Sequence, residues 1–408
     1  MDLAGATTVR SLIFTINLYA GKEGNELSPH SVYIHIPFCT NKCYYCDFNS
    51  FVTNNPQLIW DYLEALDREM TLTFQQMPPT RIETIFVGGG TPTFLDHAQM
   101  KRFLEIVQSH LGKHMAEGNE FTMEANPGTT DKEKLALMHE YGVNRLSFGV
   151  QSFDNELLKK LGRIHSKDDV YRSVDNALAV GFENLSLDLM FGLPGQTEEI
   201  FQATLEEALR MPTTHFSAYS LKVEENTLFH TLYQKGQLLL PTEDAELAMY
   251  LQLIDAMEVN GYHQYEISNF SKNGLESRHN KTYWLNNDYY GIGAGAHGYA
   301  AGERHVNAGP LAIYMQMCKE GLPRVEQFSV SQREAMEDQM ILGLRLREGV
   351  DLKRFADRFA RTVEEEFGEI VEDELKKGML ERTPSHLRLT KMALPLGNEV
   401  FARFLGDK

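Results

Sequence analysis

Cysteine is scarce in this chain: only four of its 408 residues are cysteine. Cys39, Cys43 and Cys46 fall within eight residues, and Cys318 stands alone. A disulfide framework spreads its cysteines so that they close long loops, and this clustering therefore argues against one. The clustered thiols instead indicate a site for a soft metal in a reducing compartment, and we expect the protein to be cytoplasmic.

Long apolar runs and an excess of positive charge are also missing. No segment reaches the roughly 20 apolar residues that span a bilayer, so we expect no stable membrane insertion. The formal net charge of −18 repels phosphate backbones and anionic membranes, which excludes non-specific nucleic-acid binding. We expect residues 1–30, which include a mildly apolar stretch at 11–20, to be a poorly ordered leader. A weak signal or transit peptide is the alternative.

Short β-rich runs alternate with amphipathic stretches between Ser31 and about residue 225. Strands separated by helices of this length indicate right-handed βαβ units and a parallel sheet. Six units are too few for an eight-fold barrel, so the sequence predicts an α/β fold with a partial (β/α)6 barrel over residues 31–225. The expected strands are 32–36, 84–87, 121–124, 145–150, 184–190 and 215–221, and the expected helices are 58–74, 98–111, 131–141, 167–180 and 198–210.

Polar residues and glycines follow the carboxyl ends of these expected strands. In barrel-like α/β folds that edge carries the chemistry, so we expect a single site there. The segments concerned are the three clustered cysteines, Gly88-Gly89-Gly90-Thr91-Pro92, Glu124-Ala125-Asn126-Pro127-Gly128, Gln151-Ser152 and Asp188.

The regular alternation of β-rich runs and amphipathic stretches ends at about residue 225. We expect a mixed extension at 226–325, with a long helix at 243–259, and a mainly helical C-terminal domain at 326–408. In that domain a hairpin flanks Pro384-Ser385, and the order of elements resembles a winged helix. From Ser331 to Lys408 there are 14 Lys and Arg against 16 Asp and Glu. The domain therefore lacks the basic face that DNA binding needs, and we interpret it as a structural cap.

The spacing Cys39-x3-Cys43-x2-Cys46 leaves a metal site one ligand short. A structural zinc site takes four ligands, usually from two C-x2-C pairs or from two Cys and two His. Here His35 lies in a strand, and Cys318 is the only other cysteine. Three close thiolates can hold three corners of an iron–sulfur cube and leave the fourth iron open to a small molecule. We therefore expect a 4Fe–4S cluster on the three clustered cysteines.

The C-x3-C-x2-C motif, with Tyr45 before its last cysteine, resembles the signature of the radical S-adenosylmethionine (SAM) superfamily. The Gly-Gly-Gly-Thr-Pro run, about 40 residues after the last cysteine, strengthens the resemblance. In that superfamily the open iron chelates the amino and carboxylate groups of SAM, and an electron from the cluster cleaves the sulfonium to a 5′-deoxyadenosyl radical. The resemblance implies an electron donor such as flavodoxin or ferredoxin if SAM is cleaved.

Longer motifs resemble the coproporphyrinogen oxidase-like group of that superfamily over roughly residues 31–400. They are Tyr33-Ile34-His35-Ile36-Pro37-Phe38-Cys39, Met123-Glu124-Ala125-Asn126-Pro127, Gly149-Val150-Gln151-Ser152 and Asp188-Leu189-Met190-x-Gly192-Leu193-Pro194. This resemblance implies SAM contacts at Tyr33, Gly89, Gly90, Thr91, Glu124, Gln151, Arg163 and Asp188. Carboxylates suit the ribose hydroxyls or the cationic end of SAM, and an arginine suits its carboxylate. For Arg163, which lies in a helix-like stretch, a surface salt bridge is the alternative.

Two departures separate the chain from the oxygen-independent coproporphyrinogen III oxidases of that group. Those oxidases carry a further cysteine two residues after the third, where this chain has Phe48. They also have an N-terminal segment that helps to hold substrate, which the 38 residues before Cys39 do not resemble. Both departures point to the HemW-like branch, regarded as heme chaperones. Coproporphyrinogen oxidation, or a radical SAM reaction on another substrate such as a methyl transfer, is the alternative.

The segment His279-Asn280-Lys281-Thr282-Tyr283-Trp284 fits the H-N-x-x-Y-W pattern linked to heme binding in that branch. Histidine is a common axial ligand of heme iron, and Tyr283 and Trp284 can pack on a flat porphyrin. The alternative is a hydrogen-bonded histidine beside core aromatic residues. The resemblance thus implies heme and heme-accepting apo-proteins as partners, and it allows a homodimer.

A second glycine-rich stretch, from Gly291 to Gly298, contains His297. Three interpretations stay open for it: a tight backbone approach to the cofactor pocket, a heme ligand, or a plain loop.

Overall fold

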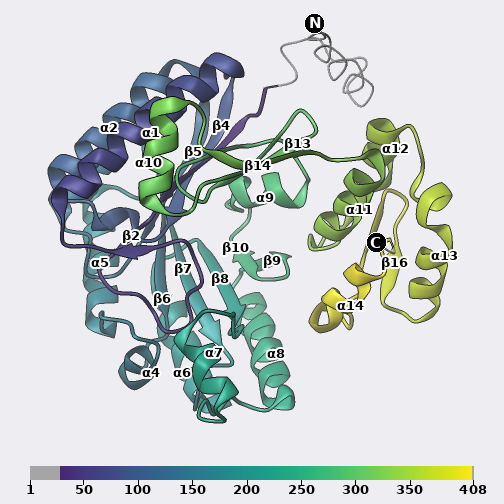
Figure 1. The fold of residues 1–408 in the computed structure, drawn as a ribbon. Helices are drawn as coiled ribbons and strands as arrows, with labels where there is room; N and C mark the ends of the chain where they lie inside the picture. The colour runs from purple at the N-terminus through teal and green to yellow at the C-terminus, as the bar shows by residue number, and fades with distance from the viewer. Residues whose placement is uncertain (1–27, 407–408) are drawn as a thin grey trace, which may run out of the picture.

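The computed structural model describes residues 28–406, so the expected leader lies outside the described residues except for its last three. The main sheet contains the six parallel strands that the sequence predicts, and their spatial order follows their order in the chain (Figure 1). They are β1 (Ser31–Ile36), β4 (Ile82–Gly89), β5 (Met115–Ala125), β6 (Arg145–Gln151), β7 (Asn184–Phe191) and β8 (His215–Ser220).

Helices alternate with these strands and cover the outer face of the curved sheet (Figure 1). Each begins at a side-chain cap where the sequence offers one: Asn55 precedes Pro56 at the start of the first helix, and Asp96 and Gln99 form a capping box at the second. The expected partial (β/α)6 barrel is thereby confirmed. Its helices are α1 (Pro56–Gln76), α2 (His97–Leu111), α3 (Lys132–Glu140), α4 (Asn155–Lys160), α5 (Lys167–Val180) and α6 (Glu198–Leu209).

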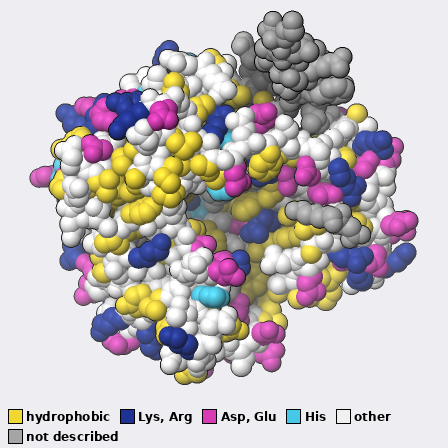
Figure 2. Space-filling model, in the orientation of Figure 1, with side chains coloured by type: hydrophobic (Ala, Val, Ile, Leu, Met, Phe, Trp, Pro, Cys, Tyr) yellow, Lys and Arg dark blue, Asp and Glu magenta, His cyan; other side chains and the backbone are white. Residues whose placement is uncertain are grey.

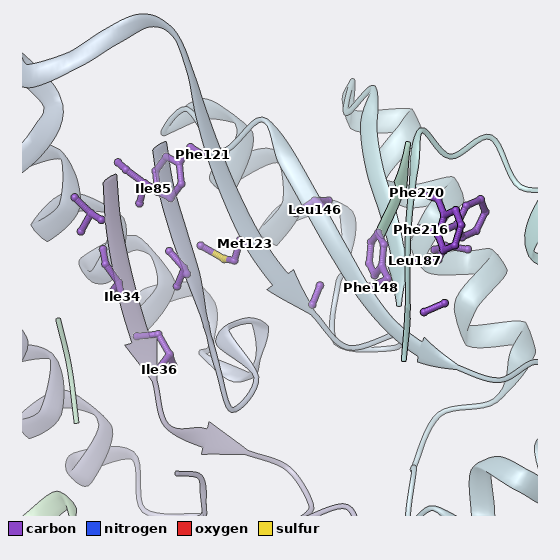
Figure 3. Packing of buried hydrophobic residues seen from close by; sticks show 14 of the residues in the cluster. Ile34, Ile36, Ile85, Phe121, Met123, Leu146, Phe148, Leu187, Phe216 and Phe270 are labelled. Atoms are coloured by element: carbon purple, nitrogen blue, oxygen red, sulfur yellow. The ribbon is translucent and has the colours of Figure 1, made fainter. Parts of the chain in front are cut away.

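The two faces of the sheet differ in polarity because side chains alternate along a strand. Apolar residues such as Ile34, Phe121 and Leu146 are buried between the sheet and the helices (Figure 3). The alternate positions, among them Tyr33 and Glu124, face the barrel interior. The hydrophobic core thus lies outside the sheet, and the interior is left to polar chemistry.

The segment after residue 225 extends the same sheet at both edges. Strand β11 (Tyr290–Ile292) pairs in parallel with β1, and β10 (Asn269–Ser271) pairs antiparallel with β8 and with β9 (His263–Glu266). These strands have three or four residues each, too short for their alternation to stand out in the sequence. The remaining elements are α7 (Leu228–Gln234), α8 (Glu243–Val259), α9 (Arg278–Trp284), β12 (His297–Ala300), β13 (Glu303–Asn307), α10 (Leu311–Glu320) and β14 (Arg324–Ser329).

The C-terminal elements follow the order helix, strand, helix, helix, strand, strand, and lie beside the barrel (Figure 1). This is the order expected for a winged-helix-like module, and its hairpin flanks Pro384-Ser385 as predicted. The elements are α11 (Gln332–Gly343), β15 (Val350–Asp351), α12 (Leu352–Phe359), α13 (Val363–Lys376), β16 (Leu380–Arg382) and β17 (His386–Leu389), followed by α14 (Gly397–Ala402).

Charged side chains of both signs are interspersed over the face of the molecule in Figure 2. None of the helices within residues 28–406 combines the length and the apolar composition needed to cross a bilayer.

Candidate functional site

The cysteine loop lies at the carboxyl edge of the barrel. Cys39 ends β2 (Phe38–Cys39), which pairs in parallel with β3 (Phe51–Val52), and the loop between them carries the other two thiols. Two backbone hydrogen bonds hold the loop: the Tyr44 amide donates to the Leu161 carbonyl (3.0 Å), and the Phe229 amide donates to the Tyr44 carbonyl (2.9 Å). The loop is therefore fixed to segments that follow β6 and β8.

The donor set of this loop fits an iron–sulfur cube better than a single metal ion. Burial raises the pKa of the Cys39 thiol, and burial together with the Cys43 and Cys39 charges raises the pKa of Cys46 to about 11. The thiols are thus close enough to act on one another. Within residues 28–406, no three His, Cys, Asp or Glu side chains are arranged to hold one metal ion. A cube spreads its thiolates over three irons, so its ligands need not meet at one point.

Arg163 supplies a positive charge beside these thiols. Its Nη1 lies 3.5 Å from Cys43 Sγ, and its Nη2 donates to Asn126 Oδ1 (2.8 Å) and to the Gly149 carbonyl. The guanidinium forms no ion pair with an acid in the described part of the chain. This geometry does not fit the surface salt bridge that the sequence left open. Arg163 faces the cysteine loop instead.

The glycine run after β4 leaves no room for side chains. A Cβ atom at Gly90 would lie 3.0 Å from Cys39 Sγ, and one at Gly89, where φ is +109°, would lie 2.3 Å from the His35 ring. The backbone therefore approaches the cysteine loop as closely as only glycine allows. The next residue, Thr91, places its hydroxyl 3.7 Å from the same Cys39 sulfur.

Two half-buried carboxyl groups, Glu124 and Asp188, lie below this rim. Glu124 Oε2 accepts a hydrogen bond from the Gly89 amide (3.1 Å), and Asp188 Oδ1 accepts one from Ser147 Oγ (2.9 Å). Burial, with the Asp188 charge added, raises the pKa of Glu124 to about 8, and burial also raises the pKa of Asp188. Two acids that are costly to ionise together favour a cationic or hydroxyl-rich ligand beside them.

Tyr33 and Gln151 complete the set of expected SAM contacts. Burial and the charge of Glu124 raise the pKa of Tyr33, whose hydroxyl bonds His35 Nδ1 (2.8 Å). Gln151 ends β6 with φ at +66°, a left-handed conformation that is uncommon for a residue with a side chain. Such strain persists where the surrounding structure enforces it and is typical of functional sites. Seven of the eight positions therefore lie on β1, β4, β5, β6 and β7 or directly after them, and the eighth, Arg163, lies between α4 and α5.

Two residues of this site were missed at the sequence level. Asn126 links Thr91 to Arg163, because its Nδ2 donates to Thr91 Oγ1 (2.8 Å) while its Oδ1 accepts from the guanidinium. His35 orients Tyr33, since its Nε2 bonds the Asn49 carbonyl (2.8 Å). A signal was available for Asn126, which stands two residues after Glu124 at the same strand end. Nothing in the sequence separates His35 from other strand residues.

The histidine of the HNxxYW segment is held by hydrogen bonds at both ring nitrogens. His279 Nδ1 pairs with Thr84 Oγ1 (2.8 Å), and its Nε2 pairs with the Tyr283 hydroxyl (2.9 Å). Burial, with the Arg145 charge added, lowers the pKa of His279 to about 3. The ring also stacks on Phe86 of β4. In this conformation His279 is a neutral histidine that fixes α9 on the sheet.

Trp284 points away from His279. The Arg345 guanidinium, from the segment after α11, lies 4.3 Å from the center of the Trp284 ring. The Tyr283 ring instead packs edge-on against Tyr289, at 4.8 Å between centroids. The structure thus does not bring the three expected heme residues together on one surface. They are divided between the barrel interior and the C-terminal domain.

The second glycine-rich stretch packs against α1. The Gly293 amide donates to Glu69 Oε2 (2.8 Å), and a Cβ atom at Gly293 would lie 2.7 Å from the His35 carbonyl. His297 is exposed at the start of β12. The backbone at Gly293 does make a tight approach, but it approaches α1 and β1 rather than a cofactor pocket.

A large cavity lies at the opposite, amino edge of the sheet. It has a volume of about 1600 Å³ and is bounded by the starts of β1 and β4, by α9 and by α12. Its charged lining includes Arg278, Lys281, Arg354 and Asp357. None of the expected cluster or SAM residues borders it. The expected cluster and SAM site at the carboxyl edge is therefore separate from this cavity.

Comparison with known proteins agrees with this geometry. The family model described as the radical SAM superfamily matches residues 33–208, and the HemN C-terminal domain model matches residues 330–396. The heme chaperone HemW of Bacillus subtilis is 46% identical over 378 residues, which cover 92% of this chain and 99% of that protein. The HemW of Lactococcus lactis is 40% identical over 93% of this chain and 98% of that protein.

This chain belongs to the HemW family. The resemblance to the radical SAM superfamily, and to its HemW-like branch, is confirmed. Among solved structures, coproporphyrinogen III oxidase (HemN) from Escherichia coli matches with a TM-score of 0.82 over 93% of this chain and 92% of that one, at 21% identity. The likeness to HemN concerns the fold alone. This HemW-family chain has Phe48 at the position of the further cysteine described above, and 61% of the Phe48 surface is exposed to solvent.

Proposed function

We propose that this protein binds heme and passes it to acceptor proteins in the cytoplasm, with a 4Fe–4S cluster and SAM bound at the carboxyl edge of its barrel. The observation that carries the proposal is near full-length similarity to relatives named heme chaperones, in a chain that has Phe48 in place of a fourth clustered cysteine. This favours a chaperone over a porphyrinogen oxidase.

Cys39, Cys43 and Cys46 would hold three irons of the cluster, and the fourth iron would accept SAM. Arg163 lies where it can pair with the carboxylate of SAM, and the half-buried acids suit its ribose or its cationic end. Tyr33, Gln151 and the backbone of Gly89, Gly90 and Thr91 would complete the pocket. When bound, the cluster supplies one-electron reduction of SAM, which requires a donor such as flavodoxin or ferredoxin.

Heme contact is proposed for α9 and the surface beside it. Tyr283 faces the interior that contains Tyr33 and Glu124, whose charges act on it. His279 can ligate iron only if Nε2 gives up its bond to the Tyr283 hydroxyl. We therefore assign His279 first to positioning α9, and leave axial ligation to a conformation in which that bond is exchanged. Trp284 would contact heme only from the side of the C-terminal domain.

Heme titration of the anaerobically reconstituted protein tests the proposal. We expect a shifted Soret band that saturates at a fixed heme-to-protein ratio, and transfer of that heme to an added apo-protein. If stoichiometric heme leaves only the spectrum of free heme, the proposal is wrong. Incubation with coproporphyrinogen III, SAM and a reductant should yield no protoporphyrinogen IX. Its formation would instead establish the oxidase.

A further inference from the structure

Arg145, the first residue of β6, points into the barrel. Its strand neighbours Leu146 and Phe148 belong to the apolar core outside the sheet, so Arg145 occupies the inward-facing register. Its backbone pairs with Thr122 of β5 and Asn184 of β7, which places it in the middle of the sheet. The side chain is 1% exposed and is the largest fully buried one among the described residues.

The Arg145 guanidinium lacks a hydrogen-bond partner at one of its nitrogens. Within residues 28–406 it forms no ion pair, and its Nε has no hydrogen-bond partner. The hydroxyl of Thr122, beside it in register, is likewise buried without a partner. Burying a charge that is not paired is strongly unfavourable, and such groups are ordinarily paired with an anion.

The acids that could neutralise Arg145 are engaged elsewhere. Glu120, on the same inward face of β5, accepts hydrogen bonds from the amides of Arg278 (2.8 Å) and His279 (3.0 Å) at the start of α9. Asp188 accepts one from Ser147. Neither acid forms an ion pair with Arg145, although the Arg145 charge opposes the rise that burial gives the pKa of Asp188.

Neutral polar groups surround the same space. His215 of β8 bonds Ser186 Oγ (2.8 Å) through Nδ1 and the Tyr265 hydroxyl (2.9 Å) through Nε2. Burial, followed by the Arg145 charge, lowers the pKa of both His215 and His279. Because His279 lies over β4 and His215 stands on β8, Arg145 acts on both sides of the barrel. Among the described residues, neutral polar groups thus surround Arg145 inside the barrel.

We propose that Arg145 binds a carboxylate of a ligand held inside the barrel, with the Thr122 hydroxyl as a second donor. A guanidinium and a carboxylate can pair through two parallel hydrogen bonds. Two ligands of this protein carry carboxylates: the propionates of heme and the methionine end of SAM. The propionate fits better, because Arg145 stands six residues, or about 20 Å, from the rim end of β6. This assignment rests on the proposed heme-binding function.

The test compares wild type, Arg145→Met and Arg145→Lys in reconstituted full-length protein, with three probes: heme, heme dimethyl ester and SAM. We expect wild type to bind heme more tightly than the ester. In Arg145→Met the affinity for heme should fall about 10- to 100-fold while the affinity for the ester stays unchanged. Arg145→Lys should restore part of the difference. The melting temperature of Arg145→Met should not fall, because replacing an unpaired buried charge by an apolar side chain of similar length does not destabilise a fold.

The pattern of affinities and melting temperatures decides the proposal. A selective loss of heme affinity supports it with the propionate as ligand, and a selective loss of SAM affinity supports it with the SAM carboxylate instead. Unchanged affinity for all three probes overturns it, as does a drop in melting temperature with equal losses for heme and ester, which marks a structural arginine. If wild type binds no heme at all, the proposed function fails, and the SAM measurement alone then decides whether Arg145 binds a carboxylate.

Discussion

The side chains at the carboxyl edge of the barrel fall into two groups, those that would bind a cofactor and those that position other side chains. The clustered thiols and Arg163 offer charges and metal-binding atoms, whereas Asn126 and His35 hold other side chains in place through hydrogen bonds. Substitutions in the first group should remove a cofactor. Substitutions in the second group should loosen the geometry around it.

Cluster binding should depend on each of the three clustered cysteines. Replacing Cys39, Cys43 or Cys46 by Ala should reduce reconstituted iron and sulfide to near zero, because two thiolates cannot hold the cube in place. Cys318→Ala is the matched control and should retain wild-type content, since this thiol is buried in α10 among core residues. Iron and sulfide analysis of the four variants checks this. Loss of the cluster in Cys318→Ala would mean a fourth protein ligand.

The half-buried acid Glu124 should make stability depend on pH. Its pKa rises from an ordinary 4.5 to about 8 in the folded protein, so the folded state binds more protons between these values than the unfolded state. Stability should therefore decline as the pH rises from about 4.5 toward about 8. Glu124→Gln removes this proton and should flatten the decline. Urea unfolding of the apo-protein at pH 5, 6, 7 and 8 measures it, and identical slopes in both proteins would contradict the account.

At the scale of elements, the C-terminal module is joined to the barrel by a buried ion pair. Glu266 of β9 is fully buried and lies 3.4 Å from Arg345, which follows α11. The Arg347 amide also donates to the Tyr265 carbonyl (2.9 Å), so backbone and side chain act together. This connection holds α9 between the two parts, because Arg354 and Arg358 of α12 donate to the carbonyls that follow it.

Breaking that ion pair should be costly. Arg345→Met leaves the Glu266 carboxylate buried without its cation and should lower the free energy of unfolding by about 2–4 kcal/mol. Arg304→Met is the matched control: Arg304 also lies over an aromatic ring, but it pairs with Asp338, and both partners are about one-third exposed. That control should lose under about 1 kcal/mol. If urea unfolding gives equal losses in the free energy of unfolding for the two variants, the buried pair stabilises the fold no more than the exposed one.

The six parallel strands could be predicted from the sequence because each contains a short run rich in apolar or β-branched residues, and most of these runs end at or before a glycine, proline or asparagine. The rim residues followed from them, since parallel strands bring their carboxyl ends together. Strands β9, β10 and β11 and the position of α9 could not be predicted, because they depend on pairing with distant residues. The same reason hides Arg145: a charge at the start of a strand reads as an exposed end until the sheet curves around it.

At the scale of the whole molecule, Arg145 and the rim site lie toward opposite ends of one barrel. The rim offers thiols and a cation for a cluster with SAM, and the interior around Arg145 offers a guanidinium and neutral polar groups for the carboxylate proposed above. The apolar core lies outside the sheet, so the interior can change its occupant without disturbing the packing that stabilises the fold. This division suits a protein that takes up a cofactor and gives it away.

The central claim is that three thiolates hold a cube with one iron open to SAM. Electron paramagnetic resonance of the reduced, reconstituted protein, recorded with and without SAM, tests it most directly. We expect a 4Fe–4S signal whose g values shift when SAM is added, because SAM then occupies the open iron. A redox-silent metal, or a cluster signal that does not change at saturating SAM, would contradict the account.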